Sequence, residues 1–274
     1  MQIRQRWGLA ALAALGTLAV TGCGSSSSDS TARIRSADYA VNGNTANVTV
    51  NTAINGGDLS KGQSTPYNFI GNGLSDFGFV TTATLPADIA TIGSPPNSRL
   101  QLSNGSFYSA YLIGRADVRG KLDQRFLQTV VTGDRSAAAI YSGSVAYTAP
   151  PSGQANVRVL NAAPDAGFTA PNTVGAVDVL INGKVAYSAV AYPPLLIATG
   201  TATSGTVAYA PAAVPVTPYQ AVPSGTISVQ VNVAGTSTVI VPPTPLSVSS
   251  GSVYTLIVSE TDITPTYTVT LEND

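Results

Sequence analysis

The carboxylates are the side chains with which this chain could carry out acid–base chemistry. Glu260 and Asp262 stand two residues apart, so a β-strand would place both on one face. Two carboxylates placed together can act as general acid and base. Because Ser and Thr surround this pair, a solvated turn is the favoured interpretation. Asp165 follows Pro164, where an aspartate can close a turn by bonding its own backbone.

Other reactive groups are scarce in the 274 residues. The chain has no histidine, which removes the commonest general base and metal ligand. Lys61, Lys121 and Lys184 are its lysines, and none has the apolar surroundings that a serine–lysine dyad needs. No EF-hand series is present, although loop carbonyls and isolated aspartates leave weak calcium binding open. We therefore expect no enzymatic activity, no cofactor and no metal site, with a carboxylate-dependent hydrolase as the alternative.

Cys23 is the only cysteine, so no intramolecular disulfide can form. It follows an apolar run, Gly8–Val20, that is preceded by Arg4 and Arg6. The run is shorter than the roughly 20 residues that a membrane-spanning helix needs. A positive start, a short apolar segment and small residues at its end are typical of a secretory signal peptide.

The tetrapeptide Val20-Thr21-Gly22-Cys23 resembles the lipobox of bacterial lipoproteins. The resemblance implies diacylglycerol transfer to the Cys23 sulfur, cleavage after Gly22 and acylation of the new amine. Two or three acyl chains give firm anchoring, whereas one binds only marginally. Gly24 stands where an aspartate would resemble an inner-membrane retention signal, so the outer membrane is the expected location. The Ser-rich residues 24–30 are expected to form a flexible tether.

The rest of the chain has the composition of an all-β protein. Charged residues make up 10% of the chain and its net charge is −1, so nothing suggests nucleic-acid binding. Short alternating runs lie between Gly, Pro and Asn clusters, a pattern that predicts antiparallel β-sandwiches. The expected strands are Ala32–Ser36, Ala46–Asn51, Phe77–Thr82, Arg99–Leu102, Phe107–Ile113, Phe126–Thr132, Val157–Leu160, Val177–Ile181, Lys184–Tyr187, Thr206–Ala210, Thr226–Val233, Thr236–Val241, Val253–Ser259 and Thr266–Leu271. A short helix near Pro86–Ala90 is a further expectation, and Asn182-Gly183 predicts a tight type I′ hairpin.

The composition changes along the chain divide it into five parts. A signal peptide (1–22) is followed by the lipidated cysteine with its tether (23–31). Two tandem sandwiches follow, at 32–147 and 155–274, with a Pro-containing linker at 148–154 between them.

Several motifs of the second half occur in a recognisable order: NVRVLNAAPD at Asn156–Asp165, AVDVLING at Ala176–Gly183, TPYQAVPSGTISVQV at Thr217–Val231 and SSGSVYTLIV at Ser249–Val258. Together they resemble the DUF4397 family of exported bacterial modules. The resemblance implies an immunoglobulin-like β-sandwich for 155–274 and implies no reaction.

The first half is interpreted as a diverged copy of the second. Ile34 aligns with Val157 at an offset of 123, and Tyr108 aligns with Tyr254 at an offset of 146. The motif that ends in Asp165 is missing from the first copy. Two long loops, Ala166–Ala176 and Val185–Thr206, interrupt the pattern of the second copy and are where a partner is expected.

Three tyrosines, Tyr187, Tyr192 and Tyr209, flank the second of these loops. They are candidates for contact with an envelope protein or a glycan, the alternative being that they cover the ends of the sandwich.

Asp178 lies in an apolar strand; on the solvent face it needs no partner, and inside it would pair with Arg158. Basic residues alternate with aspartates in one segment, which is typical of a solvated hairpin. They are Arg115, Arg119, Lys121, Arg125 and Arg135.

These observations predict an exported protein that is anchored to the membrane through lipid on Cys23. We expect a non-enzymatic binding, adhesion or structural module of the cell envelope, with a purely structural spacer as a further alternative.

Overall fold

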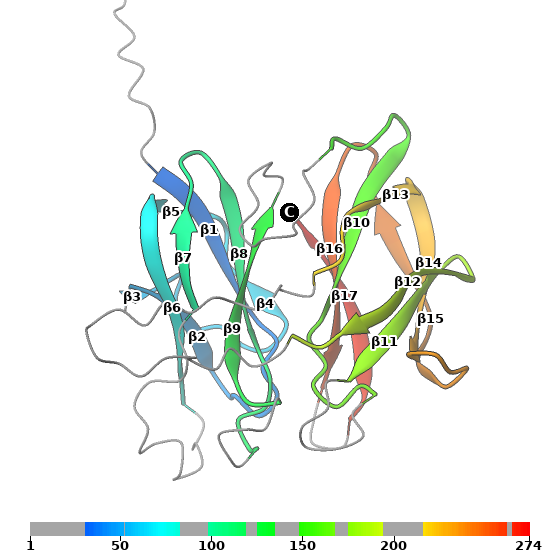
Figure 1. The fold of residues 1–274 in the computed structure, drawn as a ribbon, viewed down its shortest axis with the longest axis horizontal. Helices are drawn as coiled ribbons and strands as arrows, with labels where there is room; N and C mark the ends of the chain where they lie inside the picture. Colours follow the sequence, from blue (N-terminus) through cyan, green and yellow to red (C-terminus); the bar gives the residue numbers. More distant parts are fainter. Residues whose placement is uncertain are drawn as a thin grey trace, which may run out of the picture.

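The computed structural model describes residues 31–51, 53–82, 98–118, 125–134, 148–167, 175–193, 216–261 and 265–274. Within these ranges the regular structure is entirely β, which confirms the all-β prediction, and the strands form two β domains (Figure 1). No helix of this described part is long and apolar enough to cross a bilayer. Gly22, Cys23, the helix expected at Pro86–Ala90, and the strand expected at Thr206–Ala210 lie outside it.

The first domain contains two sheets around one core. In each sheet the strands are given in spatial order. One sheet is β4 (Gln63–Ser64), β1 (Thr31–Asp38), β8 (Phe107–Ile113) and β9 (Gln128–Asp134), with β5 (Asn68–Gly71) also paired to β1. The other is β3 (Ala53–Ile54), β2 (Ala46–Val50), β6 (Gly73–Thr81) and β7 (Ser98–Leu102).

The second domain repeats this plan. One sheet is β13 (Gln220–Pro223), β10 (Gln154–Asn161), β16 (Val253–Glu260) and β17 (Tyr267–Asn273). The other is β12 (Lys184–Ala191), β11 (Ala176–Ile181), β14 (Gly225–Val233) and β15 (Val239–Val248).

The strand register is the same in both domains. Arg33 of β1 lies opposite Phe107 of β8, and Asn156 of β10 lies opposite Val253 of β16. These pairs stand at the offsets of 123 and 146 that relate the two halves of the sequence. Both pairings are parallel, so the expectation of purely antiparallel sheets is wrong. A parallel pair needs a long crossover, and here the remaining strands between β1 and β8, or between β10 and β16, supply it.

Local turn chemistry forms the hairpin between β11 and β12 as predicted. Asn182 and Gly183 both have positive φ, at 51° and 76°, and Ile181 pairs directly with Lys184. Other elements escaped prediction: β3, β4, β5 and β13 are short, and β15 runs on through Pro242, Pro243 and Pro245. Proline is tolerated there because β15 lies at the edge of its sheet.

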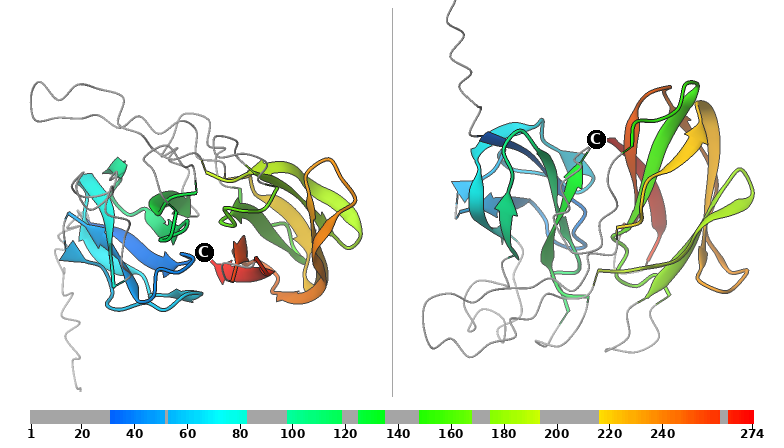
Figure 2. Two further views of the ribbon diagram at one scale, coloured as in Figure 1. Left: turned by 90° about the horizontal axis from the view of Figure 1, so that it is seen from below. Right: turned by 45° about the horizontal axis from the view of Figure 1, so that its top comes forward.

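In the sheets that contain β1 and β10, successive side chains point to opposite faces, and one face of each sheet packs in the core of its own domain. On β1, Ala32 and Ile34 are buried in the first core, and on β10, Val157 and Val159 are buried in the second. The intervening residues of these strands face away from the cores. Many of them are buried all the same, because the two domains pack against each other through these faces, and the chain end at Asp274 lies between them (Figure 2).

Candidate functional site

The strongest concentration of charged side chains lies in the seam, which we define as the buried contact between the outer faces of β1, β8 and β9 and those of β10, β16 and β17. Its centre is the arginine–aspartate exchange, formed by Arg35, Arg158, Asp134 and Asp274. All four residues are buried. They come from four different strands or strand ends. The pairs Arg35–Asp274 and Arg158–Asp134 join one domain to the other, and Arg158 also lies 3.4 Å from Asp274 of its own domain.

Arg35 of β1 reaches from the first domain into the second. Its Nε donates to Ser109 Oγ at 2.6 Å within its own domain. Its Nη1 and Nη2 donate across the seam to the Asn273 carbonyl and to Asp274 Oδ1, both at 2.6 Å. The guanidinium carbon lies 5.3 Å from the ring centre of Tyr67, which covers its face.

Arg158 of β10 makes the same set of contacts in the opposite direction. Its Nε donates to Thr255 Oγ1 at 2.8 Å within the second domain. Its Nη1 donates to the Gly133 carbonyl at 2.7 Å, and its Nη2 donates to Asp134 Oδ1. Its guanidinium lies 4.8 Å from the ring centre of Tyr219. Each arginine therefore binds one backbone carbonyl and one aspartate of the opposite domain.

Hydroxyl groups occupy the remaining oxygens of the two aspartates. Asp134 Oδ2 accepts hydrogen bonds from Ser109 and from the Tyr67 hydroxyl, the latter at 3.0 Å. In the second domain the equivalent donors to Asp274 are the hydroxyls of Thr255 and Tyr219, at 2.7 and 2.6 Å. The hydrogen bonds and ion pairs of the exchange thus offset the free-energy cost of burying these charged side chains.

The seam has approximate twofold symmetry because the domains are copies that face each other through the same sheet. Arg35 and Arg158 are related by the offset of 123, and Ser109 and Thr255 by the offset of 146. A two-fold interface places the same patch on both partners, so that a contact made in one direction is made in the other. The chain is therefore arranged like a homodimer whose two subunits have been joined.

The electrostatics of the exchange depend on burial and on mutual charge. Burial and the nearby Asp274 carboxylate raise the pKa of Asp134, while Arg158 and Arg35 oppose that rise. Burial acts to lower the pKa of Arg158, but Asp274, Tyr219 and Asp134 outweigh it, so that the net change is upward. Burial likewise opposes the charge of Arg35, but the pKa of Arg35 is raised as well, through Tyr111, Asp134 and Asp274, so both guanidinium groups stay charged in the buried seam.

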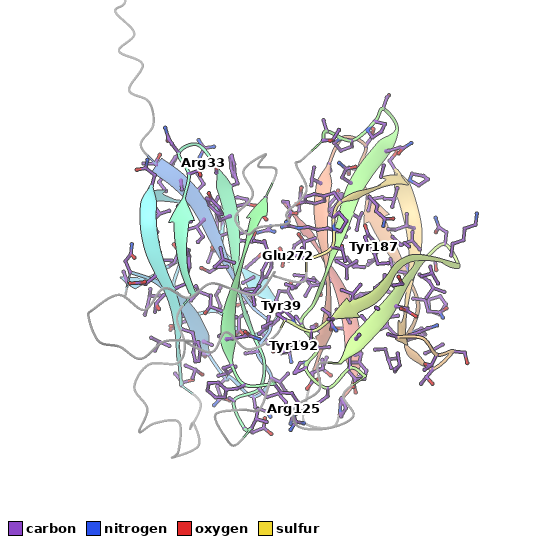
Figure 3. All side chains as sticks on the ribbon, in the orientation of Figure 1. Arg33, Tyr39, Arg125, Tyr187, Tyr192 and Glu272 are labelled. Carbon is purple, nitrogen blue, oxygen red and sulfur yellow. The ribbon has the colours of Figure 1, made fainter. Side chains whose placement is uncertain are left out.

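Apolar and aromatic residues complete the seam beside the exchange. The Tyr39 hydroxyl donates to Glu272 Oε1 at 2.7 Å across the two domains, and Figure 3 shows both residues between the sheets. The buried apolar members are Ala37, Tyr39, Tyr111, Ile113, Val130, Leu160, Ala162, Tyr192 and Ile257.

A second ion cluster lies at one end of the seam and has no symmetric counterpart. Arg115 of the first domain pairs with Asp165 and, at 3.1 Å, with Glu260 of the second. Arg125 also pairs with Asp165, at 3.0 Å, and the Asp165 amide donates to Glu260 Oε2 at 3.0 Å. Burial and the Asp165 charge raise the pKa of Glu260 to about 7, against the lowering effect of Arg115 and Lys61.

These positions correct several sequence-based interpretations. Glu260 is fully buried rather than solvated, and Arg115 is a buried cross-domain partner rather than part of a solvated hairpin. Asp165 is both a turn residue and an ion-pair partner, so turn chemistry describes only part of its role. Asp262 lies outside the described residues.

The proposed pair between Arg158 and Asp178 is not formed. Arg158 faces the seam, while Asp178 lies on the other sheet of its domain and accepts from the Ala189 and Gly235 amides. The pairing failed because β10 and β11 belong to different sheets, so their outward faces point in opposite directions.

The tyrosines proposed for partner contact are buried where the structure describes them. The Tyr187 hydroxyl donates to the Val157 carbonyl inside the second domain, and Tyr192 belongs to the seam. Tyr187 packs in the second core and Tyr192 packs between the two domains, so neither offers a free contact surface. Tyr209 lies outside the described residues.

No sequence motif predicted the seam, although the sequence contains one indication of it. An arginine stands inside an apolar alternating run in both halves, as Ile34-Arg35 and as Val157-Arg158. A charged side chain at the same position of two copies indicates a shared buried environment with a compensating charge.

The comparisons with known proteins add no identity. No protein-family model matches the chain, and no curated protein matches it. No group of three or more potential metal ligands occurs among the described residues. The fold and the site therefore define the chain as a protein of two β domains joined through buried ion pairs.

Proposed function

We propose that this protein is a lipid-anchored component of the bacterial cell envelope whose two β domains act together as one rigid, non-enzymatic binding or structural module. The observation that carries the proposal is the arginine–aspartate exchange. Domains of one chain normally move relative to each other unless their interface is large and apolar. Here the contact adds buried charges that cannot separate without losing their partners, which supports a single rigid body.

The chemistry of the site also favours a structural role over catalysis. Asp134 and Asp274 accept hydrogen bonds at both oxygens from arginines and hydroxyls of the protein itself. Glu260 is held by Arg115 and by a backbone amide. Groups of the protein itself thus engage both oxygens of each of these three carboxylates.

The finer description of the fold belongs to the same proposal. We infer that each domain is an immunoglobulin-like sandwich and that the second belongs to the DUF4397 group. The packing of two sheets around one core in each domain supports the first inference. The ordered motifs between Asn156 and Val258 support the second.

Anchoring is supported by the apolar leader, by Gly22-Cys23 and by the Ser-rich segment before the first strand. The test is the substitution Cys23→Ser, with Ser26→Ala in the tether as the matched control. We expect the Cys23→Ser protein to leave the membrane fraction and the control to stay there after a high-salt wash. Retention of the Cys23→Ser protein, or failure of the native protein to incorporate labelled fatty acid, would refute the lipid anchor.

Rigidity has an independent test in the same protein. Spin labels on the exposed residues Ile54 and Val185, one on each domain, report the distance between the domains. We expect a single narrow distance distribution for the native seam and a broad one for Arg35→Met combined with Arg158→Met. A broad distribution in the native protein would contradict the rigid module.

A further inference from the structure

A row of three side chains at one end of the first domain has no role in either core. Phe69 of β5, Arg33 of β1 and Phe107 of β8 lie side by side on adjacent strands, and we call them the aromatic–arginine row. The Arg33 guanidinium carbon lies 5.0 Å from the Phe69 ring centre and 4.8 Å from that of Phe107. The rings of Tyr67 and Phe107 pack edge to face, with 5.2 Å between their centres.

One member of the row, Phe69, is exposed, whereas Arg33 and Phe107 are half-buried. Phe69 is 68% exposed, more than any other large apolar side chain of the described residues. No carboxylate in the described part of the chain forms an ion pair with Arg33. A cation held between two rings, one of them open to solvent, suits a partner that has both negative charge and apolar groups.

The second domain provides an internal comparison. At the positions equivalent to Phe69, Arg33 and Phe107 it has Ala221, Asn156 and Val253 in the same register. The adjacent row, in contrast, keeps its arginine and tyrosine in both domains, as Arg35 with Tyr67 and as Arg158 with Tyr219. The fold therefore requires the seam residues but not the aromatic–arginine row, which is a property of the first domain alone.

The position of the row relative to the anchor indicates what it contacts. Arg33 lies two residues after Thr31, where β1 begins, and Figure 3 shows it at that end of the first domain. Thr31 lies eight positions after Cys23 in the sequence. Fully extended, these eight residue-to-residue steps span at most about 29 Å. The row thus lies close to the point where the lipid-bearing segment joins the folded protein.

We propose that the aromatic–arginine row docks onto the anionic phospholipid surface of the membrane in which Cys23 is anchored. This inference rests on the proposed lipid anchor. Arg33 pairs with a lipid phosphate, and the exposed Phe69 ring enters the boundary between headgroups and acyl chains. A single arginine and one ring bind weakly on their own. The tether makes the contact intramolecular, so that a weak contact is enough to orient the whole rigid body.

The fluorescence of a single introduced tryptophan can report this contact. The only tryptophan is Trp7, which cleavage after Gly22 removes. The substitution Phe69→Trp therefore creates a protein with a single tryptophan at the row. Val185→Trp, at a residue 59% exposed on β12 of the second domain, is the matched control. Phe107→Trp serves as a second reporter in the same row.

The acylated full-length mature proteins are reconstituted into vesicles of phosphatidylglycerol and phosphatidylcholine, with or without brominated acyl chains. We expect a blue-shifted emission and strong bromine quenching for Phe69→Trp, and neither effect for Val185→Trp. Adding Arg33→Gln to Phe69→Trp should reduce the quenching, and so should vesicles of phosphatidylcholine alone.

The outcomes separate the two proposals. If the proteins do not float with the vesicles, the lipid anchor itself fails. If they float and Phe69→Trp is quenched no more than Val185→Trp, the docking surface is refuted while the anchor stands. A blue shift produced by soluble peptidoglycan fragments and not by vesicles would also refute it, in favour of a glycan partner.

Discussion

Removing Arg158 tests whether the arginine–aspartate exchange holds the two domains together. Arg158→Met keeps much of the apolar volume of the side chain but deletes its bonds to Asp134 and to the Gly133 carbonyl. Asp134 is fully buried, so water does not replace the lost guanidinium. The carboxylate is then left in the seam with hydroxyl donors and a more distant arginine.

The loss of stability in Arg158→Met has an upper limit, because the buried Asp134 carboxylate can take up a proton and become neutral. At pH 7 the medium is about 3 pH units above the ordinary pKa of an aspartate, and each unit costs about 1.4 kcal/mol. Protonation thus limits the loss to about 4 kcal/mol. This value agrees with the roughly 3–5 kcal/mol observed when one partner of a buried ion pair is removed. A loss of this size is a large part of the total stability of a domain, about 5–15 kcal/mol.

The pH dependence has a definite sign. In the variant, burial raises the pKa of Asp134 above its unfolded value, so that folding takes up a proton when the pH lies between the two values. Such a group loses stability as the pH rises through that window. The pKa of Asp134 is raised in the native protein too, so part of this pH dependence is common to both proteins. The defect of Arg158→Met should therefore be smaller at pH 5 than at pH 7, by at most about 3 kcal/mol, at about 1.4 kcal/mol per unit.

Urea unfolding followed by circular dichroism at pH 5 and pH 7 measures both quantities. Arg33→Met is the matched control, since Arg33 lies on the outer face of β1 without an ion-paired carboxylate among the described residues. It loses two cation–π contacts, with Phe69 and Phe107, and should cost about 1–2 kcal/mol, at about 0.5–1 kcal/mol for each. The reasoning is refuted if Arg158→Met costs no more than this control, or the same at both pH values.

Three further substitutions test other parts of the structure. Burial raises the pKa of Glu260 to about 7, above its ordinary 4.5, so its contribution to stability falls as the pH rises from about 4.5 to 7. In Glu260→Gln the urea unfolding midpoint should therefore change less with pH over this range, and the same change with pH as in the native protein would contradict the buried position. Gly114 has φ of +100°, and a Cβ there would lie 2.4 Å from a backbone oxygen, so Gly114→Ala should lower the melting temperature far more than Gly57→Ala, whose site has φ of +89° but open space. Equal melting temperatures for these two variants would show that the close contact is absent. Tyr187→Phe removes a buried hydrogen bond to a backbone carbonyl and should cost about 1 kcal/mol in urea unfolding; no loss would mean that the bond does not form.

The strands that sequence reasoning located best are those whose signal is local. Phe107–Ile113 has the predicted bounds, because the run lies between the Asn104-Gly105 turn and Gly114. The short strands β3, β4, β5 and β13 span two to four residues, too few for an alternation to be recognised. They exist because a neighbouring strand already offers free hydrogen-bonding groups at its edge.

The candidate site illustrates the opposite case. Arg35 and Asp274 are 239 residues apart, and Arg158 and Asp134 are 24 residues apart with a domain boundary between them. Nothing in the spacing of these residues indicates that they meet. The pair of Arg158 with an inward-facing Asp178 does not form, because the two residues lie on different sheets of the second domain and Asp178 binds the Ala189 and Gly235 amides instead.

Sequence alone determined the all-β class, the tight turn at Asn182-Gly183 and the correspondence between the two halves, since each depends on neighbouring residues or on a repeated pattern. It also contained the lipobox-like segment on which the anchoring proposal depends. Tertiary structure alone decided that the two copies face each other, and hence that Arg35 and Arg158 exchange aspartates across a buried seam. The physical reason is that charge burial and ion pairing depend on the packing of surfaces that lie far apart in the chain.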